Sequence, residues 1–130
     1  MVAGVTPRIL HVLELQQRLA DEELRTLVDR FYERVQADAL LGPVFAARIA
    51  TDGWPRHLDK MAGFWSTILR GSNRYHGDPM AVHRALPDLS PAHFDRWLGL
   101  FREVTAELFD DEVAASIVQR AERMANRMQA

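Results

Sequence analysis

The sequence contains no cysteine. This absence excludes disulfide bonds, thiolate ligands to a metal ion and the cysteine-based zinc sites of small domains. Long hydrophobic runs are also missing: the longest stretches without a charged residue, residues 39–47 and 61–69, are nine residues each. A membrane-spanning helix needs roughly 20 predominantly apolar residues, so neither stretch could cross a bilayer.

Neither sign of charge predominates in the sequence. The 16 basic and 18 acidic residues give a formal net charge of -2, with no long run of either sign. Nucleic acids and anionic membranes are bound by basic patches or stripes, so we expect neither as a partner. A small neutral ligand fits this composition better.

Length and composition predict one domain over residues 1–130. With 130 residues, of which 48% are hydrophobic, the chain can bury a substantial core. The first eight residues have neither a charged start nor a complete apolar segment of the kind that directs export. We therefore expect a cytoplasmic protein.

Apolar residues recur at steps of three and four and almost never alternate, which predicts an all-α fold with short connections. We expect a first short helix to begin at Thr6 and Pro7 and to end before Asp21, which would cap the second helix. Gly42 and Pro43 end that second helix in a tight corner. Its inward face comprises Leu24, Leu27, Val28, Phe31, Tyr32 and Val35.

Pro55 suits the first turn of a third helix, and Gly71 closes it. One face of this helix carries His57, Met61, Phe64, Trp65 and Ile68. Pro79 then begins a short helix that carries His83, and Pro87 stops it after about two turns.

Two long helices follow. Ser90 and Pro91 form a cap and first-position signal for the first of them, and Asp110 with Asp111 precedes the second. The inward residues of the first are Phe94, Trp97, Leu98, Phe101, Val104 and Leu108. The inward residues of the second are Val113, Ile117, Ala121, Met124 and Met128.

Two histidines carry most of the chemical information. His83 follows His57 by 26 positions, and an imidazole can bind a porphyrin iron from one face while a polar residue opposite meets the gas ligand. Residue types alone leave simpler interpretations open, because His83 could be a surface residue and His57 a partly buried core residue. Likewise, the single polar hydrogens of Tyr32 and Trp97 could meet either a ligand or a backbone carbonyl.

Five short patterns occur in order between Leu24 and Met128. They are Phe31-Tyr32, Leu40-Leu41-Gly42-Pro43-Val44-Phe45, His57-Leu58-x-x-Met61-x-x-Phe64-Trp65, Tyr75-x-Gly77-x-Pro79-x-x-x-His83 and His93-Phe94-x-x-Trp97-Leu98-x-Leu100-Phe101. In this order the patterns resemble the truncated haemoglobins, whose helices pack two over two around haem, and within them the third group. The glycine pairs typical of the first two groups are missing near the helix ends, which agrees with the third group.

This resemblance implies His83 as the proximal iron ligand. It implies Tyr32, His57 and Trp97 as the polar set on the opposite, distal side, and Phe45 as a residue that packs on the porphyrin. The implied cofactor is haem b, and it would be held non-covalently because no cysteine can attach it. Unless they are plain core residues, further apolar contacts with the ring are expected from Phe31, Met61, Phe64, Trp65, Leu86, Phe94 and Trp97.

Haem carries two propionates, so basic or hydroxyl groups are expected at the mouth of the pocket. Lys60, the only lysine of the chain, lies one turn from the His57 face and is the first candidate, with Tyr75 as the second. Arg48, Arg70, Arg74 and Arg84 are weaker candidates, because an arginine on a helical protein is usually a solvated surface residue.

A donor-rich distal side favours chemistry on a held gas. A hydrogen bond to a ligand that gains negative charge contributes about 1.5 to 3 kcal/mol and slows its release. Several such donors disfavour bulk oxygen transport and favour oxygen and nitric oxide chemistry or sensing, with carbon monoxide as a further small ligand. Nitric oxide dioxygenase activity and peroxidase-like activity are the enzymatic alternatives.

Either activity would need an external reductase, since the sequence contains no Gly-x-Gly-x-x-Gly nucleotide motif. Two further classes remain open. A cofactor-free helical interaction module would explain the apolar faces but not the polar residues on them. A non-haem metal site at His57 and His83 would lack the paired Glu-x-x-His motifs of di-iron bundles.

Overall fold

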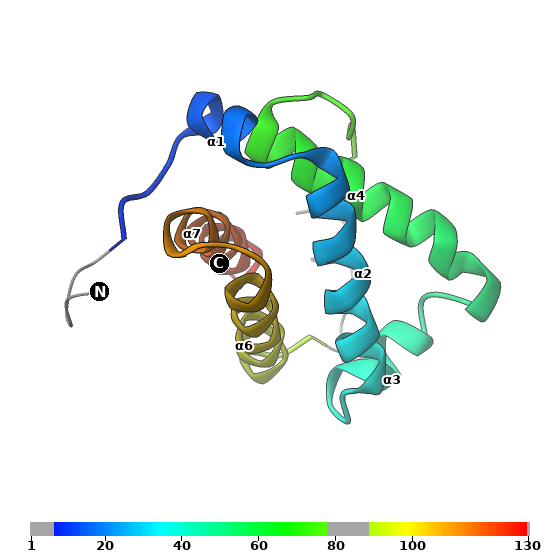
Figure 1. The fold of residues 1–130 in the computed structure, drawn as a ribbon. Helices are drawn as coiled ribbons and strands as arrows, with labels where there is room; N and C mark the ends of the chain where they lie inside the picture. Colours follow the sequence, from blue (N-terminus) through cyan, green and yellow to red (C-terminus); the bar gives the residue numbers. More distant parts are fainter. Residues whose placement is uncertain (1–6, 78–88, 130) are drawn as a thin grey trace.

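The computed structural model describes residues 7–77 and 89–129 of the chain. Every regular element within these residues is helical (Figure 1). The elements are α1 (Val12–Arg18), α2 (Asp21–Ala37), α3 (Leu41–Ala46), the 3-10 helix η1 (Thr51–Gly53), α4 (Trp54–Arg70), α6 (Pro91–Leu108) and α7 (Asp111–Gln129). His83, Leu86 and the short helix predicted around them lie outside the described residues. No helix in the described part of the chain is long and apolar enough to span a membrane.

The long helices form two pairs. α2 packs against α4, α6 packs against α7, and the contact of α2 with α6 joins the pairs (Figure 1). The shorter α1 packs on α4, and α3 packs on α2. The predicted all-α, two-over-two arrangement is confirmed.

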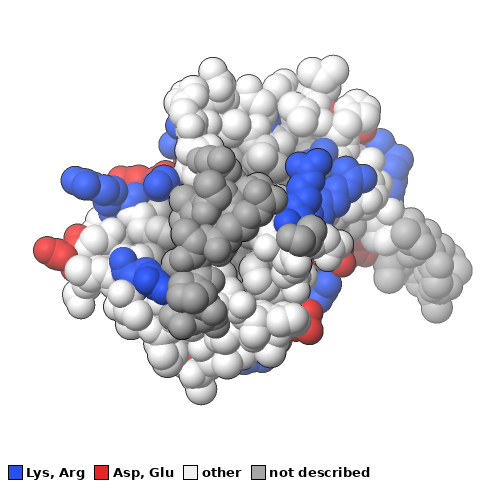
Figure 2. All heavy atoms as spheres, turned by 180° about the vertical axis from the view of Figure 1, so that it is seen from behind, with Lys and Arg blue, Asp and Glu red and all other residues white. Residues whose placement is uncertain are grey.

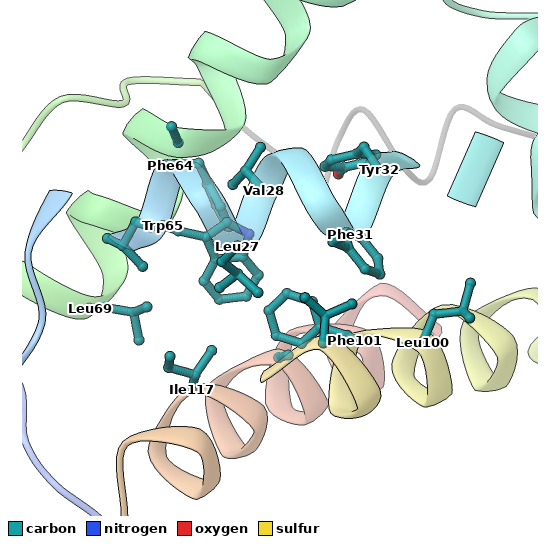
Figure 3. Packing of buried hydrophobic residues seen from close by; sticks show 14 of the residues in the cluster. Leu27, Val28, Phe31, Tyr32, Phe64, Trp65, Leu69, Leu100, Phe101 and Ile117 are labelled. Atoms are coloured by element: carbon teal, nitrogen blue, oxygen red, sulfur yellow. The ribbon is translucent and has the colours of Figure 1, made fainter. Parts of the chain in front are cut away.

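The hydrophobic core lies between the two pairs. The Phe101 ring of α6 stacks on Trp65 of α4, with ring centroids 5.0 Å apart, and meets Phe31 of α2 edge-on at 5.1 Å. Figure 3 shows Leu27 from α2 and Ile117 from α7 turned toward the same space. Each long helix therefore contributes its apolar face to one shared core.

α1 begins later than predicted, at Val12 instead of Pro7. The residues before it are tied to α7: the Leu10 N–H donates to the Ser116 hydroxyl (2.7 Å), and the Leu10 carbonyl accepts from the Arg120 guanidinium (2.9 Å). An extended segment bonded in this way satisfies its backbone groups without a helical turn. The predicted start at Pro7 was therefore wrong.

α2 starts at Asp21, so Asp21 is its first helical residue and not its cap. Ala20 occupies the cap position, and the Glu23 carboxylate accepts the Ala20 N–H (2.9 Å). The Asp21 carboxylate instead accepts the hydroxyl of Ser66 from α4 (2.7 Å). The predicted cap was wrong because a tertiary hydrogen bond uses that side chain. The predicted apolar face is confirmed, and all its members are buried: Leu24, Leu27, Val28, Phe31, Tyr32 and Val35.

α3 is a short helix at the predicted corner. The Asp38 carboxylate accepts the backbone N–H groups of Leu40 (3.1 Å) and Leu41 (3.0 Å), which satisfies donors at the helix start. A Cβ atom at Gly42 would lie 2.7 Å from the carbonyl oxygen of Gln36. The close approach of α3 to the end of α2 therefore requires glycine there.

The predicted end of α2 at Gly42 and Pro43 was wrong: α2 ends at Ala37, because the backbone is extended at Asp38, whose carboxylate bonds the start of α3, and both predicted residues lie within α3. The helix ends predicted at Pro79 and Pro87 lie outside the described residues.

The predicted ends of α4 and the predicted start of α6 are confirmed. Pro55 lies in the first turn of α4, and Gly71 follows its last residue with a left-handed φ of 65°. α6 begins at Pro91 after Ser90, whose N–H donates to Nδ1 of His93 (3.2 Å). These signals are local, which is why the sequence revealed them.

Candidate ligand-binding cavity

A cavity of about 390 Å³ lies between α2, α3, α4, α6 and α7. A volume of this order is typical of pockets that bind organic ligands. Its lining residues are Tyr32, Leu41, Val44, Phe45, Arg48, Ile49, His57, Lys60, Met61, Phe64, Trp65, Tyr75, Leu89, His93, Phe94, Trp97, Ala121, Met124, Ala125 and Met128. Most are aliphatic or aromatic, so the cavity suits a large apolar group with a few polar contacts.

Most of the residues predicted for a binding site meet here. They are Tyr32, Phe45, His57, Lys60, Met61, Phe64, Trp65, Tyr75, Phe94 and Trp97. Phe31 does not line the cavity: it is 1% exposed, and its ring centroid lies 4.9 Å from that of Tyr32 and 5.1 Å from that of Trp97. Phe31 therefore supports the wall from behind.

Tyr32 reaches the cavity from the buried face of α2. Burial raises the pKa of its hydroxyl, and no hydrogen bond from another described residue contributes to that shift. The cause is that a phenolate would lose its hydration in these surroundings. Its ring meets the His57 ring edge-on, with centroids 5.0 Å apart. Tyr32 therefore keeps its proton, so its hydroxyl can donate a hydrogen bond at the cavity wall.

His57 is half-buried on α4. Its Nε2 atom is buried and has no hydrogen-bond partner among the described residues. Burial and, to a smaller extent, the charge of Lys60 lower the pKa of the imidazole, so the ring is neutral at pH 7. Buried polar atoms are nearly always hydrogen-bonded. This Nε2 atom therefore points to a ligand that completes its bonding.

Trp54 packs beside Tyr32, Phe45 and His57, and the sequence reasoning did not predict it as part of the site. Its ring centroid lies 5.4 Å from that of His57, 5.9 Å from that of Tyr32 and 6.4 Å from that of Phe45. Trp54 packs behind these rings and limits their movement. It lies three residues before His57, and neighbours at that spacing on a helix share a face, so the spacing was a usable signal.

Trp97 is held in place by stacking. Its ring lies over Phe101 with centroids 5.0 Å apart and an interplanar angle of 9°. Phe101 in turn stacks on Trp65, and Phe31 meets the edges of both Trp97 and Phe101. Core packing therefore sets the position of Trp97 at the cavity wall.

Lys60 and Tyr75 lie at the edge of the cavity, where a second hollow of about 380 Å³ begins. Its other lining residues are Asp59, Gly63, Arg74, His76 and Gly77. The Lys60 Nζ atom is 5.9 Å from the centroid of the Tyr75 ring, and that ring meets Phe64 edge-on at 5.1 Å. A cation and a phenol at this edge suit a ligand with an anionic rim.

The arginines considered for such a rim have different positions. Arg48 lines the cavity, whereas Arg74 lines the second hollow. The Arg70 and Arg74 guanidiniums lie 3.1 and 3.7 Å from the Asp21 carboxylate. Arg84 lies outside the described residues. Figure 2 shows basic side chains in separate groups, and not as one continuous patch, on the face opposite to that of Figure 1.

The wall from α7 was not predicted as part of a site. It consists of Ala121, Met124, Ala125 and Met128, and Leu41, Val44, Ile49 and Leu89 extend the apolar lining elsewhere. Helical spacing predicted several of these residues to face inward, but spacing cannot separate a side chain that fills a core from one that borders a space. His93 accepts the Ser90 N–H at its Nδ1 atom and also lines the cavity.

Known proteins resemble this chain in both sequence and structure. The model of the bacterial-like globin family matches residues 19–130. Group 3 truncated hemoglobin ctb of Campylobacter jejuni is 34% identical over 115 residues, which cover 87% of this chain and 91% of that protein. Group 2 truncated hemoglobin YjbI of Bacillus subtilis is 29% identical over 117 residues, covering 86% of this chain and 85% of that protein.

The similarity extends to three dimensions. A crystal structure of the group III truncated hemoglobin from Campylobacter jejuni matches this chain with a TM-score of 0.82 at 34% sequence identity. The match covers 85% of this chain and 89% of that chain.

Proposed function

Since this chain belongs to the bacterial-like globins and, within them, to the truncated haemoglobins of the third group, a family of haem proteins that bind small ligands, we propose that it holds haem b non-covalently in the cavity. The observation that carries this proposal is the buried Nε2 atom of His57, which has no hydrogen-bond partner among the described residues and lies on the cavity wall beside the protonated Tyr32 side chain. In a plain helical core this nitrogen would carry an uncompensated desolvation cost.

The residues around the cavity fit a planar apolar cofactor with an anionic rim. His83, outside the described residues, would ligate the iron, and Leu86 near it would contact the ring. Lys60 and Tyr75 would meet the propionates at the cavity edge. The apolar contacts would come from Phe45, Met61, Phe64, Trp65, Phe94 and Trp97, which all line the cavity.

Haem supplies an iron with a coordination position free for a small diatomic ligand such as oxygen, nitric oxide or carbon monoxide. The Tyr32 hydroxyl would donate a hydrogen bond to that ligand, because burial keeps the phenol protonated. The neutral His57 ring and the Trp97 N–H would complete the distal set. The aromatic side chains behind them keep water from the donors, which strengthens each hydrogen bond.

Such a distal set favours retention of oxygen over its delivery. Each hydrogen bond to a ligand with partial negative charge contributes about 1.5 to 3 kcal/mol, so release slows about ten-fold or more. The proposed role is therefore oxygen and nitric oxide chemistry or sensing. Nitric oxide, oxygen and one electron combine to give nitrate, so a separate reductase would have to return that electron to the protein.

Haem binding is tested by spectroscopy on the purified chain. We expect a Soret band that shifts after reduction and addition of carbon monoxide. The variant His83→Ala should lose stable haem binding or show an abnormal Soret band, while His11→Ala, a change at an exposed histidine of the α1 end, should leave the spectrum unchanged. A wild-type spectrum from His83→Ala would mean that another residue holds the iron.

The proposed chemistry is tested with nitric oxide. Ferrous protein equilibrated with oxygen should convert added nitric oxide to stoichiometric nitrate faster than it releases oxygen in a stopped-flow experiment. Rapid oxygen release without nitrate formation would favour transport and would contradict the proposed role.

A further inference from the structure

Thr67 connects α4 to the loop that carries Tyr75. Its hydroxyl donates to the carbonyl of Gly63 (2.9 Å) and accepts the backbone N–H groups of Arg74 (2.8 Å) and Tyr75 (2.9 Å). A hydroxyl has one hydrogen to donate and two lone pairs that accept. The full bonding capacity of this hydroxyl is therefore in use, and two of its three bonds hold the loop.

The loop needs an unusual backbone to return to α4. Gly71 and Asn73 have left-handed φ angles of 65° and 60°, which reverse the chain after the helix. Ser66 lies 2.7 Å from both the Asp21 carboxylate and the Ser72 hydroxyl. Because the single Ser66 hydrogen goes to Asp21, Ser72 donates to Ser66. Ser66 thus secures the first half of the loop.

The second half of the loop sets the position of the Tyr75 ring. The ring meets Phe64 edge-on at an interplanar angle of 88°, and Lys60 Nζ lies 5.9 Å from its centroid. A Cβ atom at Gly77 would fall 2.3 Å from the Tyr75 hydroxyl oxygen. The hydroxyl therefore lies over the Gly77 backbone, in a space that exists because glycine has no side chain.

Thr105, a buried threonine of α6, shows the difference between a local and a connecting role. The Thr105 hydroxyl of α6 shares its one hydrogen between the carbonyls of Phe101 and Arg102 in its own helix, both at 3.0 Å. Thr105 contacts no loop in this way. Thr67 makes the same kind of bond to its own helix and adds two bonds to the loop backbone.

From these contacts we infer that Thr67 is a positioning residue for the cofactor edge. Its hydroxyl holds the backbone N–H of Tyr75, and this bond sets where the phenol stands beside Lys60 at the cavity edge. The expected effect of Thr67 on haem binding rests on the proposed function, whereas its expected effect on the position of Tyr75 does not.

Thr67→Val tests the inference, because valine keeps the shape of threonine but can neither accept nor donate a hydrogen bond. Hydrogen exchange of the Arg74 and Tyr75 amides, followed by NMR on the full chain, should accelerate about ten-fold. Thr67→Ser should restore wild-type exchange, and Thr105→Val, the matched control, should leave these two amides unchanged. Wild-type exchange in Thr67→Val would overturn the inference.

Haemin release to an excess of a haem-scavenging protein gives the second readout. Thr67→Val should release haemin about ten-fold faster, and should add nothing in a Tyr75→Ala background. Equal acceleration in that background would show that Thr67 acts by another route and would overturn the inference. Gly77→Ala displaces the Tyr75 hydroxyl without a change in α4 and should also speed release.

The two proposals fail in different ways. If the wild-type chain takes up no haemin, the proposed function fails, while amide exchange still decides whether Thr67 positions Tyr75. If haemin binds and Thr67→Val releases it at the wild-type rate, the inference about the cofactor edge is overturned and the proposed function stands.

Discussion

Tyr32 and His57 show how one cause produces opposite pKa shifts in neighbouring side chains. Burial raises the pKa of the Tyr32 hydroxyl and lowers the pKa of the His57 imidazole. The charged form of tyrosine has lost a proton, whereas the charged form of histidine has gained one, and burial disfavours both charged forms. The cavity therefore contains two neutral polar groups, which can hydrogen-bond a small uncharged ligand.

Tyr32→Phe should speed oxygen dissociation from the ferrous haem protein about ten-fold, because it removes a hydrogen bond to a ligand with partial negative charge. Stopped-flow displacement of oxygen by carbon monoxide measures this rate. Tyr75→Phe also removes a phenol hydroxyl, but at the cavity edge, and should leave the oxygen dissociation rate unchanged. Equal rates for wild type and Tyr32→Phe would remove Tyr32 from the set of donors.

His57 should make stability depend on pH. Its folded-state pKa lies below its unfolded value of about 6.5, so the unfolded chain takes up the proton first as the pH falls. The corresponding stability is present above about pH 6.5 and is lost as the pH falls through the folded-state pKa. We expect His57→Gln to lose less free energy of unfolding than the wild type between about pH 7.5 and about pH 5.5.

Urea unfolding at these two pH values measures the difference. Equal losses in wild type and His57→Gln would assign the pH dependence to other groups. His11→Gln, at a mostly exposed position, serves as the control for removal of a histidine.

At the scale of single elements, α4 organises the site. It carries His57, Lys60, Met61, Phe64 and Trp65 to the cavity and Ser66 and Thr67 to the loop. The ends of α4 determine which residues belong to the helix, and Pro55 and Gly71 predicted both ends. A change at the C-terminal end should therefore affect stability in a defined way.

Gly71→Ala should lower the free energy of unfolding by about 1 to 2 kcal/mol, because a left-handed φ is unfavourable for a residue with a Cβ atom. That Cβ would also lie 3.3 Å from the Cγ1 atom of Val12. Gly99→Ala is the matched control: Gly99 lies within α6, a Cβ there would meet nothing within 4 Å, and we expect a gain of about 0.5 to 1 kcal/mol. Urea unfolding compares the two, and equal effects would contradict the backbone argument.

At the scale of the whole molecule, five of the helices that the structure describes line the candidate cavity. α2 and α4 come from one pair and α6 and α7 from the other, with α3 at the corner. A ligand that fills this cavity bridges both pairs. Its binding should therefore stabilise the entire fold, and not one helix alone.

Haemin should raise the free energy of unfolding by about 2.7 kcal/mol when its free concentration is a hundred times its dissociation constant. Urea unfolding with and without haemin, at matched protein concentration, measures this gain. His83→Ala should show little of it at the same haemin concentration. An unfolding midpoint that ignores haemin in the wild type would contradict cofactor binding.

The successes and errors of the sequence reasoning follow a physical division. The α2 face from Leu24 to Val35 and the end of α4 at Gly71 depend on neighbours within a few residues, and both were predicted. The cap at Asp21 and the helix start at Pro7 were wrong because partners distant in sequence, Ser66 for Asp21 and α7 for the segment before α1, took the groups involved.

Some residues of the candidate site were predicted from the sequence and others were missed. The family resemblance of the ordered motifs implied Tyr32, His57 and Trp97 as one set, and these three residues line the same cavity. Trp54 behind them and the α7 wall with Met124 were missed. A residue that borders a space and a residue that fills a core have the same helical spacing, so periodicity cannot distinguish them.

The sequence by itself determined that the chain is helical, which faces turn inward, where most of the long helices end, and which family the ordered motifs resemble. Each of these depends on the period of the helix, on short-range capping or on residue order. Only the tertiary structure decided which inward side chains border a cavity, which hydroxyls bond to a neighbouring element, and which buried polar atoms lack a hydrogen-bond partner among the described residues. Those properties depend on distances between residues far apart in the chain, and no local pattern encodes them.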